Sequence, residues 1–173
     1  MKSTVIIALL IFLQPAMVYA DAEVNFSGTL VEEPCMLAPE DSAIEIDFGT
    51  VINKLLYSHK RTSGKPFTLH LLECDLSLGD KVSITFIGTE DADQAGMIAL
   101  DASSTTSGIA IGIETLENEL IPINRTAEFQ TLKKGSNEIN LQIFISAENK
   151  AINEKTITPG QLTTNITFLL NYE

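Results

Sequence analysis

The sequence predicts an all-β fold in which two sheets pack as a sandwich. Short runs of alternating apolar and polar residues recur along the chain, and this is the period of a strand that is buried on one face. Each run is rich in β-branched or aromatic residues and is bounded by Gly, Asp, Asn, Ser or Pro. No helical heptad, internal repeat, low-complexity tract or interdomain linker interrupts the pattern. A single all-β domain is therefore expected.

Five such runs precede the C-terminal one, and each predicts a strand. Their apolar faces are, in chain order, Ile44, Ile46 and Phe48; Phe67, Leu69 and Leu71; Val82, Ile84 and Phe86; Ile109, Ile111 and Ile113; and Leu141, Ile143 and Ile145. Four other stretches are polar and rich in turn-forming residues, and we interpret them as surface loops: 88–96, 101–108, 114–120 and 146–160.

The last run, "QLTTNITFLLNYE", has the most regular alternation in the chain. One face carries Leu162, Ile166, Phe168, Leu170 and Tyr172, and the other carries Thr163, Asn165, Thr167 and Asn171. The given sequence ends with this run, so no later strand follows to cover its apolar face. We expect a final strand that packs onto the core.

The first twenty residues have the pattern of a secretory signal peptide. Lys2 is followed by an apolar run from Val5 to Leu13, and small residues end at Ala20, which is the expected cleavage site. The apolar run is much shorter than the roughly 20 residues that cross a bilayer, so stable membrane insertion is not expected. Cleavage leaves residues 21–173 and changes the net charge from −12 to −13 through loss of Lys2. A field of this sign repels nucleic acids and anionic lipids and favours a basic partner.

Cys35 and Cys74 are the only cysteines in the sequence. A secreted chain enters an oxidising compartment, where such a pair forms a disulfide rather than two free thiols. A loop of this length is stabilised by roughly 4 kcal/mol in the chain-entropy model. We expect a structural role, because there is no C-x-x-C motif.

The sequence contains no constellation that indicates catalysis or a cofactor. A sandwich of this size with one disulfide could be a copper/zinc superoxide dismutase, but His59 and His70 cannot supply the cluster of imidazoles that such a site needs. The paired carboxylates lie in polar segments, and neither a G-x-S-x-G motif nor a phosphate-binding loop is present. We predict a protein that is not an enzyme and has no metal or cofactor.

Four features together make residues 21–173 resemble the pilin subunits of the chaperone/usher family, particularly the minor subunits of P-type and type 1 fimbriae. A short alternating segment with a glycine, "VNFSGTLV", precedes "EEPC", and the second cysteine closes a strand of the form "FTLHLLECD". Gly160 lies fourteen residues from the end, counting both ends, and Tyr172 is the penultimate residue. In this order and at these spacings, the four features indicate a fimbrial subunit.

The resemblance implies an incomplete immunoglobulin-like sandwich that lacks its last strand, in a pilin domain at residues 32–173. The missing strand would leave a groove between the regions 44–48 and 162–172. Residues 21–31 would be a donor-strand extension that fills the groove of another subunit, with one face formed by Ala22, Val24, Phe26, Gly28 and Leu30. The residues that would form the acceptor groove and bind the chaperone are Gly160, Leu162, Ile166, Phe168, Leu170, Tyr172 and Glu173.

The same resemblance implies three partners: a periplasmic chaperone, an outer-membrane usher and the neighbouring fimbrial subunits. The protein would pass through the periplasm and become part of a fimbrium on the bacterial surface. A minor or adaptor subunit is the first interpretation of its place in the fibre, a major rod subunit the second and a terminator the third. The alternative from another class is a self-sufficient secreted sandwich that binds a ligand through its loops.

Overall fold

The computed structural model describes residues 27–28 and 32–173 of the chain. The chain divides into two compact units, Met1–Val31 and Glu32–Glu173, and the fold below is that of the second unit. The predicted signal peptide, residues 1–20, lies outside the described residues, as do Ala22, Val24, Phe26 and Leu30 of the predicted donor face.

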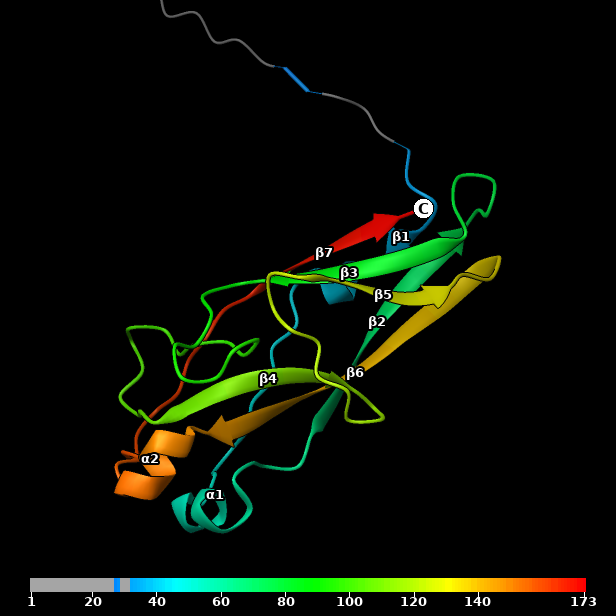
Figure 1. The fold of residues 1–173 in the computed structure, drawn as a ribbon. Helices are drawn as coiled ribbons and strands as arrows, with labels where there is room; N and C mark the ends of the chain where they lie inside the picture. The colour runs from blue at the N-terminus through cyan, green and yellow to red at the C-terminus, as the bar shows by residue number, and fades with distance from the viewer. Residues whose placement is uncertain (1–26, 29–31) are drawn as a thin grey trace, which may run out of the picture. The chain divides into compact units, whose positions relative to one another are not determined.

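Two antiparallel sheets form the second unit (Figure 1). The first has the order β1-β2-β6-β4, with β1 at Met36–Leu37, β2 at Lys65–Cys74, β6 at Gly135–Ala147 and β4 at Ile109–Thr115. The second has the order β5-β3-β7, with β5 at Thr126–Thr131, β3 at Lys81–Ile87 and β7 at Thr167–Tyr172. The predicted all-β sandwich is confirmed.

The core between the sheets is built from the apolar faces that the alternation predicts. Leu69 and Leu71 of β2, Ile84 of β3 and Ile111 of β4 are completely buried. Because successive side chains of a strand point to opposite faces, each of these strands contributes every second residue to this core. The rows from β2, β3, β4 and β6 pack into one hydrophobic cluster.

A disulfide joins Cys35 to Cys74, as predicted, with their Cα atoms 4.1 Å apart. Cys35 directly precedes β1 and Cys74 ends β2, so the bond fixes the start of β1 against the end of β2. The main chain adds to this link, because the N–H of Asp75 donates to the carbonyl of Pro34 at 2.7 Å. Cross-linking a loop of 39 residues stabilises the fold by about 4 kcal/mol in the chain-entropy model.

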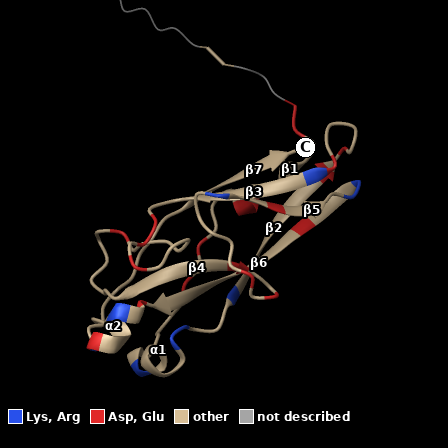
Figure 2. Ribbon diagram, in the orientation of Figure 1, with Lys and Arg blue, Asp and Glu red and all other residues tan. Residues whose placement is uncertain are grey.

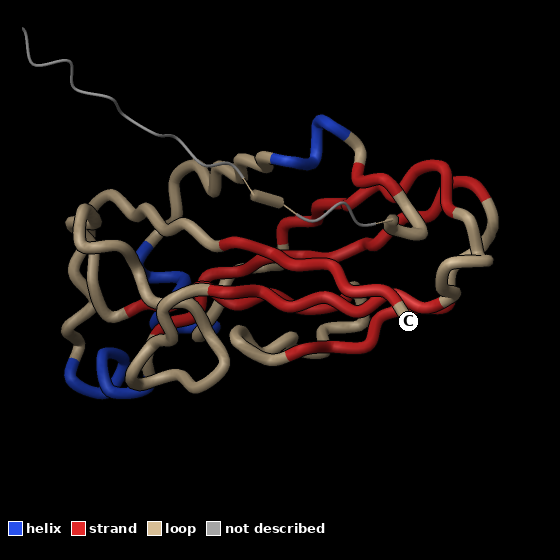
Figure 3. Tube along the Cα trace, turned by 90° about the horizontal axis from the view of Figure 1, so that it is seen from above, coloured by secondary structure: helices blue, strands red, loops and turns tan. Residues whose placement is uncertain are grey.

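Three short helices accompany the sheets: η1 at Pro39–Ser42, α1 at Asn53–His59 and α2 at Asn149–Glu154. In both views of the molecule, α1 and α2 lie at the end away from the C-terminus (Figures 1 and 3). Helices α1 and α2 were not predicted, because six or seven residues are too few to establish a helical period. α2 lies inside the predicted surface loop 146–160.

The prediction of a strand at Ile44–Phe48 is wrong. Residues 43–52 form no strand, although they alternate like one. Residues 43–51 make no backbone–backbone hydrogen bond to other described residues, and a strand exists only where a neighbouring backbone pairs with it. Conversely, β5 was missed, since only Ala127 and Phe129 mark its inner face.

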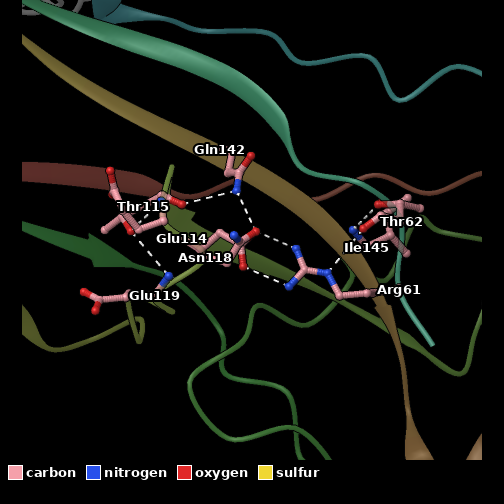
Figure 4. A network of polar contacts seen from close by, with 9 residues as sticks. Arg61, Thr62, Glu114, Thr115, Asn118, Glu119, Gln142 and Ile145 are labelled. Carbon is pink, nitrogen blue, oxygen red and sulfur yellow. Dashed lines mark hydrogen bonds and ion pairs between the residues drawn. The ribbon is translucent and has the colours of Figure 1, made fainter. Parts of the chain in front are cut away.

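The predicted loop 114–120 also needs correction at its first residues. Glu114 and Thr115 belong to β4, and Glu114 is 1% exposed. The Arg61 guanidinium binds the Glu114 carboxylate through two hydrogen bonds of 2.9 and 2.5 Å, and the Gln142 amide donates to it at 2.9 Å (Figure 4). Arg61 also stacks over the Phe144 ring at 3.6 Å. These contacts satisfy the buried carboxylate and cover the outer face of β4.

Candidate functional site: an open edge at β7

The last strand, β7, has an apolar face that the rest of the domain does not cover completely. In the register with β3, Val82 pairs with Tyr172, Ile84 with Leu170 and Phe86 with Phe168. The three β3 residues are at most 2% exposed, whereas their three partners on β7 are only partly buried. Directly paired residues lie on the same face of a sheet. The other sheet therefore buries this face at β3 but leaves it partly exposed at β7.

The backbone of β7 is likewise unpaired on one side. β7 is an edge strand of its sheet, with β3 as its single neighbour among the described strands. In Figure 1, β7 follows β3 and no further strand lies beyond it. An edge of this kind presents a row of N–H and C=O groups to which another strand can bind. We call β7 with its inward residues Phe168, Leu170 and Tyr172 the open edge.

A second unpaired segment, residues 43–51, packs against the same core. Phe48 and Val51 are partly buried against the hydrophobic cluster, and Ile44 is 37% exposed. The segment follows η1, where the buried Asp41 carboxylate accepts hydrogen bonds from the backbone N–H of His70 at 2.5 Å and pairs with its ring Nδ1 at 2.9 Å. Asp41 thus replaces β1 as the partner of β2 and directs the chain away from that strand.

The C-terminus lies at the disulfide end of the sandwich. The main-chain oxygen of Glu173 accepts hydrogen bonds from the N–H groups of Asp80 and Lys81, at 2.8 and 3.0 Å. Gly79 has a φ of +155°, and a Cβ there would lie 3.0 Å from this oxygen and 3.2 Å from Pro34 Cγ. A side chain at position 79 would therefore press against both Glu173 and Pro34 and push them apart.

The pKa of Tyr172 reflects its surroundings at the disulfide end of the sandwich. Partial burial of the phenol raises its pKa above the ordinary value, and the nearby charge of Glu33 raises it further. Both effects disfavour the phenolate. Glu33, which stands just before the disulfide, is thus a neighbour of the last apolar residue of the open edge.

The segment that leads into β7 continues the alternation without being a strand. Leu162 and Ile166 are partly buried against the core, and the Thr163 carbonyl accepts a hydrogen bond from the N–H of Asp101 at 2.9 Å. Gly160 lies close to the backbone of Thr105, since a Cβ at this glycine would be 2.6 Å from the Thr105 carbonyl carbon. The structure therefore places Leu162, Ile166, Phe168, Leu170 and Tyr172 in one row, with Gly160 before it and Glu173 after it.

What this arrangement can do chemically is bind an extended chain. Strand addition at an exposed edge combines backbone hydrogen bonds with pockets for alternate side chains. In the part of the chain that the structure describes, no cluster of three or more His, Cys, Asp or Glu side chains is placed to hold a metal ion. Gly79 lies beside the C-terminus, directly after the open edge, and was not predicted. A glycine in a turn gives no sequence signal of that role.

Comparison with known proteins identifies the family. A family model described as fimbrial protein matches residues 24–173. The chain belongs to the fimbrial protein family. Among its relatives, an uncharacterized fimbrial-like protein of Escherichia coli, YfcP, is 32% identical over 88% of this chain and 84% of its own length. The putative minor fimbrial subunit PmfF of Proteus mirabilis is 26% identical over 100% of both chains.

Solved structures have the same fold as this fimbrial protein. A subunit from a chaperone-usher pilus matches with a TM-score of 0.70 and 20% identity, over 92% of this chain and 100% of that one. The P pilus rod subunit PapA matches with a TM-score of 0.69 and 17% identity, over 82% of this chain and 100% of that one. These matches confirm the immunoglobulin-like pilin fold.

The fimbrial protein is thus a structural subunit of a surface appendage and not an enzyme. Subunits of a pilus bind one another, so other subunits are its partners. Among the described residues, none of the helices is long and apolar enough to span a membrane.

Proposed function

We propose that this fimbrial protein polymerises by donor-strand exchange. A periplasmic chaperone first lends a strand to the open edge, and at the outer-membrane usher the N-terminal segment of another subunit replaces it. Residues 21–31 are the segment that this chain donates, through the face Ala22, Val24, Phe26, Gly28 and Leu30. The residues that accept a strand are Gly160, Leu162, Ile166, Phe168, Leu170, Tyr172 and Glu173.

The observation that carries this proposal is the difference in burial between paired residues of β3 and β7. Phe86 is 2% exposed and Ile84 is completely buried, yet Phe168 and Leu170 opposite them are partly exposed. One more strand beside β7 would cover these side chains and pair with the free backbone edge. The unpaired segment 43–51, which packs against the same core, supports the same interpretation as the other side of the acceptor.

The donor segment has the composition that such a strand requires. Complete burial of Val24, Phe26 and Leu30 would contribute about 1.5 to 3 kcal/mol each before the cost of ordering the segment. Each backbone hydrogen bond to the acceptor adds about 0.5 to 1.5 kcal/mol. Gly28 fits where the backbone of the acceptor approaches closely. We expect the polymer to dissociate very slowly.

Within the fibre, we propose the place of a minor or adaptor subunit that contributes to adhesion. The likeness to PmfF, a putative minor subunit, supports this over its full length. A major rod subunit and a terminator are the alternatives, and reconstituted fibres labelled at this subunit would distinguish the three.

The acceptor is tested with two substitutions on neighbouring residues of β7. Leu170→Asp places a charge on the inward face, and we expect loss of chaperone binding. Leu169→Asp is the matched control, because Leu169 is 49% exposed on the outward face, and it should bind the chaperone normally. Co-purification from the periplasm measures both. Equal binding by the two variants would contradict strand acceptance at β7.

The donor is tested on the N-terminal segment. Phe26→Asp or Gly28→Trp should leave the chaperone complex intact but prevent docking onto the preceding subunit, whereas Ser27→Asp, on the other face of the alternation, should dock. Deletion of residues 21–31 should also abolish assembly. If the mature chain accumulates as a stable monomer without chaperone and assembles without residues 21–31, it is instead the self-sufficient ligand-binding sandwich.

A further inference from the structure

Charge is strongly segregated along this acidic chain. Residues 21–47 contain eight acidic residues and no Lys or Arg. Residues 48–72 contain no acidic residue, four of the 11 basic ones and both histidines. The basic residues are Lys54, Lys60, Arg61 and Lys65, which lie in α1, in the turn after it and at the start of β2. In Figure 2, basic residues are drawn on α1, after it and at the start of β2.

The same stretch lines a shallow, open hollow of about 400 Å³, which we call the α1 hollow. Its lining residues are Phe48, Thr50, Val51, Ile52, Leu55, Thr62, Ser63, Gly64 and Lys65. Ile52 is 67% exposed and Leu55 is 39% exposed, so apolar surface is presented to solvent there. Large exposed apolar side chains that gather at a depression indicate a binding surface.

Three lysines supply the positive charge around the α1 hollow. Arg61 is bound to the buried Glu114, so its charge is already compensated. Lys65 lines the hollow, and its ammonium donates to the main-chain carbonyl of Asp47. Within residues 32–173, the ion pairs are those of Arg61 with Glu114 and His70 with Asp41, and neither Lys54 nor Lys60 takes part in them.

The α1 hollow and the C-terminus lie at opposite ends of the sandwich. β2 begins with Lys65 at the hollow and ends with Cys74 at the disulfide, a length of roughly 33 Å for ten residues. At the disulfide end, Glu32 and Glu33 are exposed and directly follow the segment that we propose as the donor strand. The exposed Glu32–Glu33 pair and Lys65 of the α1 hollow thus stand at opposite ends of one body.

We propose that the α1 hollow receives the Glu32–Glu33 pair of a second copy of this chain. This inference rests on the proposed strand insertion and adds an electrostatic docking site to it. The two surfaces differ, so the contact is head-to-tail and can repeat along a fibre.

The physical need for such a site follows from the net charge. Two copies with the charge of −13 expected for residues 21–173 repel one another, so an approaching acidic segment requires a local region of opposite sign. The lysines near the α1 hollow provide this positive region. They favour an approach in which the acidic end of the segment faces the hollow. Since exposed charges are screened within about 10 Å at 0.1 M salt, the effect must weaken as salt is added.

The test follows the uptake of a synthetic peptide of residues 21–34 by the chaperone-held mature chain. Lys54→Glu with Lys65→Glu should slow uptake about tenfold at low salt and have little effect at about 1 M salt. A peptide with Glu32→Gln and Glu33→Gln should be equally slow on the unmodified chain, and a peptide with Glu32→Lys and Glu33→Lys should restore fast uptake by the lysine variant. Lys54→Glu alone, at an exposed helix position, should give an intermediate rate without a risk to folding.

The matched control is Lys133→Glu with Lys134→Glu, which makes the same change in net charge at the exposed turn between β5 and β6. If this control slows uptake as much as the Lys54 and Lys65 variant, net charge alone acts and the α1 hollow is not the docking site. No uptake of the unmodified peptide would also overturn the second copy as the occupant. Strand acceptance itself is judged separately, by chaperone binding of the Leu170→Asp variant.

Discussion

Two of the edge strands of this sandwich, β4 and β7, differ in how completely the rest of the domain covers them. β4 is buried on both faces along Ile109–Glu114, and short segments cover its outer backbone. Ile111 exchanges two hydrogen bonds with Ile98, at 2.8 and 3.0 Å, and the Ile113 carbonyl accepts one from Ile121 at 2.8 Å. β7, in contrast, has exposed residues on one face, partly buried residues on the other and no covering segment among the described residues.

The difference shows that the open edge is a local feature and not a sign of a loosely packed domain. At β4 even a carboxylate is buried, because Arg61 and Gln142 supply its hydrogen bonds and Phe144 fills the surface beside it. At β7 the inward side chains are apolar and regularly spaced, yet they are only partly covered. Natural proteins protect exposed edges against association, so an unprotected apolar edge indicates a surface that binds another strand.

The largest loss of stability is expected when the covered edge at β4 loses its ion pair between Arg61 and Glu114. Arg61→Ala leaves the Glu114 carboxylate buried without its cation, which should lower the free energy of unfolding by about 3 to 5 kcal/mol. Urea denaturation of the mature chain measures this value. Arg125→Ala is the control at an exposed position and should change stability by less than about 0.5 kcal/mol. A similar small loss for Arg61→Ala would mean that water replaces the guanidinium.

A leucine-to-alanine substitution at Leu141 in the covered core can be compared directly with the same substitution at Leu170 in the open edge. Leu141→Ala removes a completely buried side chain and should cost about 2 to 5 kcal/mol. Leu170→Ala, at a partly buried position, should cost about 1 kcal/mol or less in the free chain. Its cost should rise once a strand occupies the edge, which chemical denaturation of the chaperone complex would detect. Equal costs in the free chain would mean that β7 is already covered.

A smaller loss is expected from filling the space beside Phe144. A Cβ at Gly112 would overlap the Phe144 ring, so the ring must move away from β4 and from Arg61. Gly112→Ala should therefore destabilise the fold by about 1 to 3 kcal/mol in thermal or urea unfolding. Combination with Phe144→Leu should recover part of this loss. Additive losses in the double variant would show that the ring is not the obstacle.

The smallest effect concerns Glu148, which stands between β6 and α2. Burial raises the pKa of its carboxyl above the ordinary value of 4.5, and the charges of Asp91 and Asp93 raise it further. The folded chain thus holds this proton to a higher pH than the unfolded chain does, so stability falls as pH rises through this interval. Glu148→Gln should reduce that decline in melting temperature as the pH rises above about 4.5. An unchanged pH profile would contradict the assignment.

Much of the fold could be predicted from local patterns. The alternations of β2, β3, β4 and β6 gave the inward residues correctly, because burial on one face of a strand imposes a period of two. The disulfide was predictable from two cysteines behind a secretory pattern. The last run was recognised as a strand with an apolar row, and β7 occupies its second half.

The errors have a common physical origin. The run Ile44–Phe48 alternates as well as any strand, yet it has no neighbour to pair with, since Asp41 binds the N–H of His70 where β1 ends. Glu114 was placed in a solvated loop because a carboxylate is rarely buried, and its cation, Arg61, is 53 residues away in sequence. Neither outcome depends on local composition.

By itself, the sequence determined which face of each strand is apolar, which cysteines pair and, through these patterns, the resemblance to fimbrial subunits. Only the tertiary structure decided which apolar faces are covered. Phe86 and Phe168 have equivalent places in alternating runs, but sheet packing buries the first and leaves the second partly exposed. Periodicity is a property of neighbours in sequence, whereas cover depends on segments that are brought together by the fold.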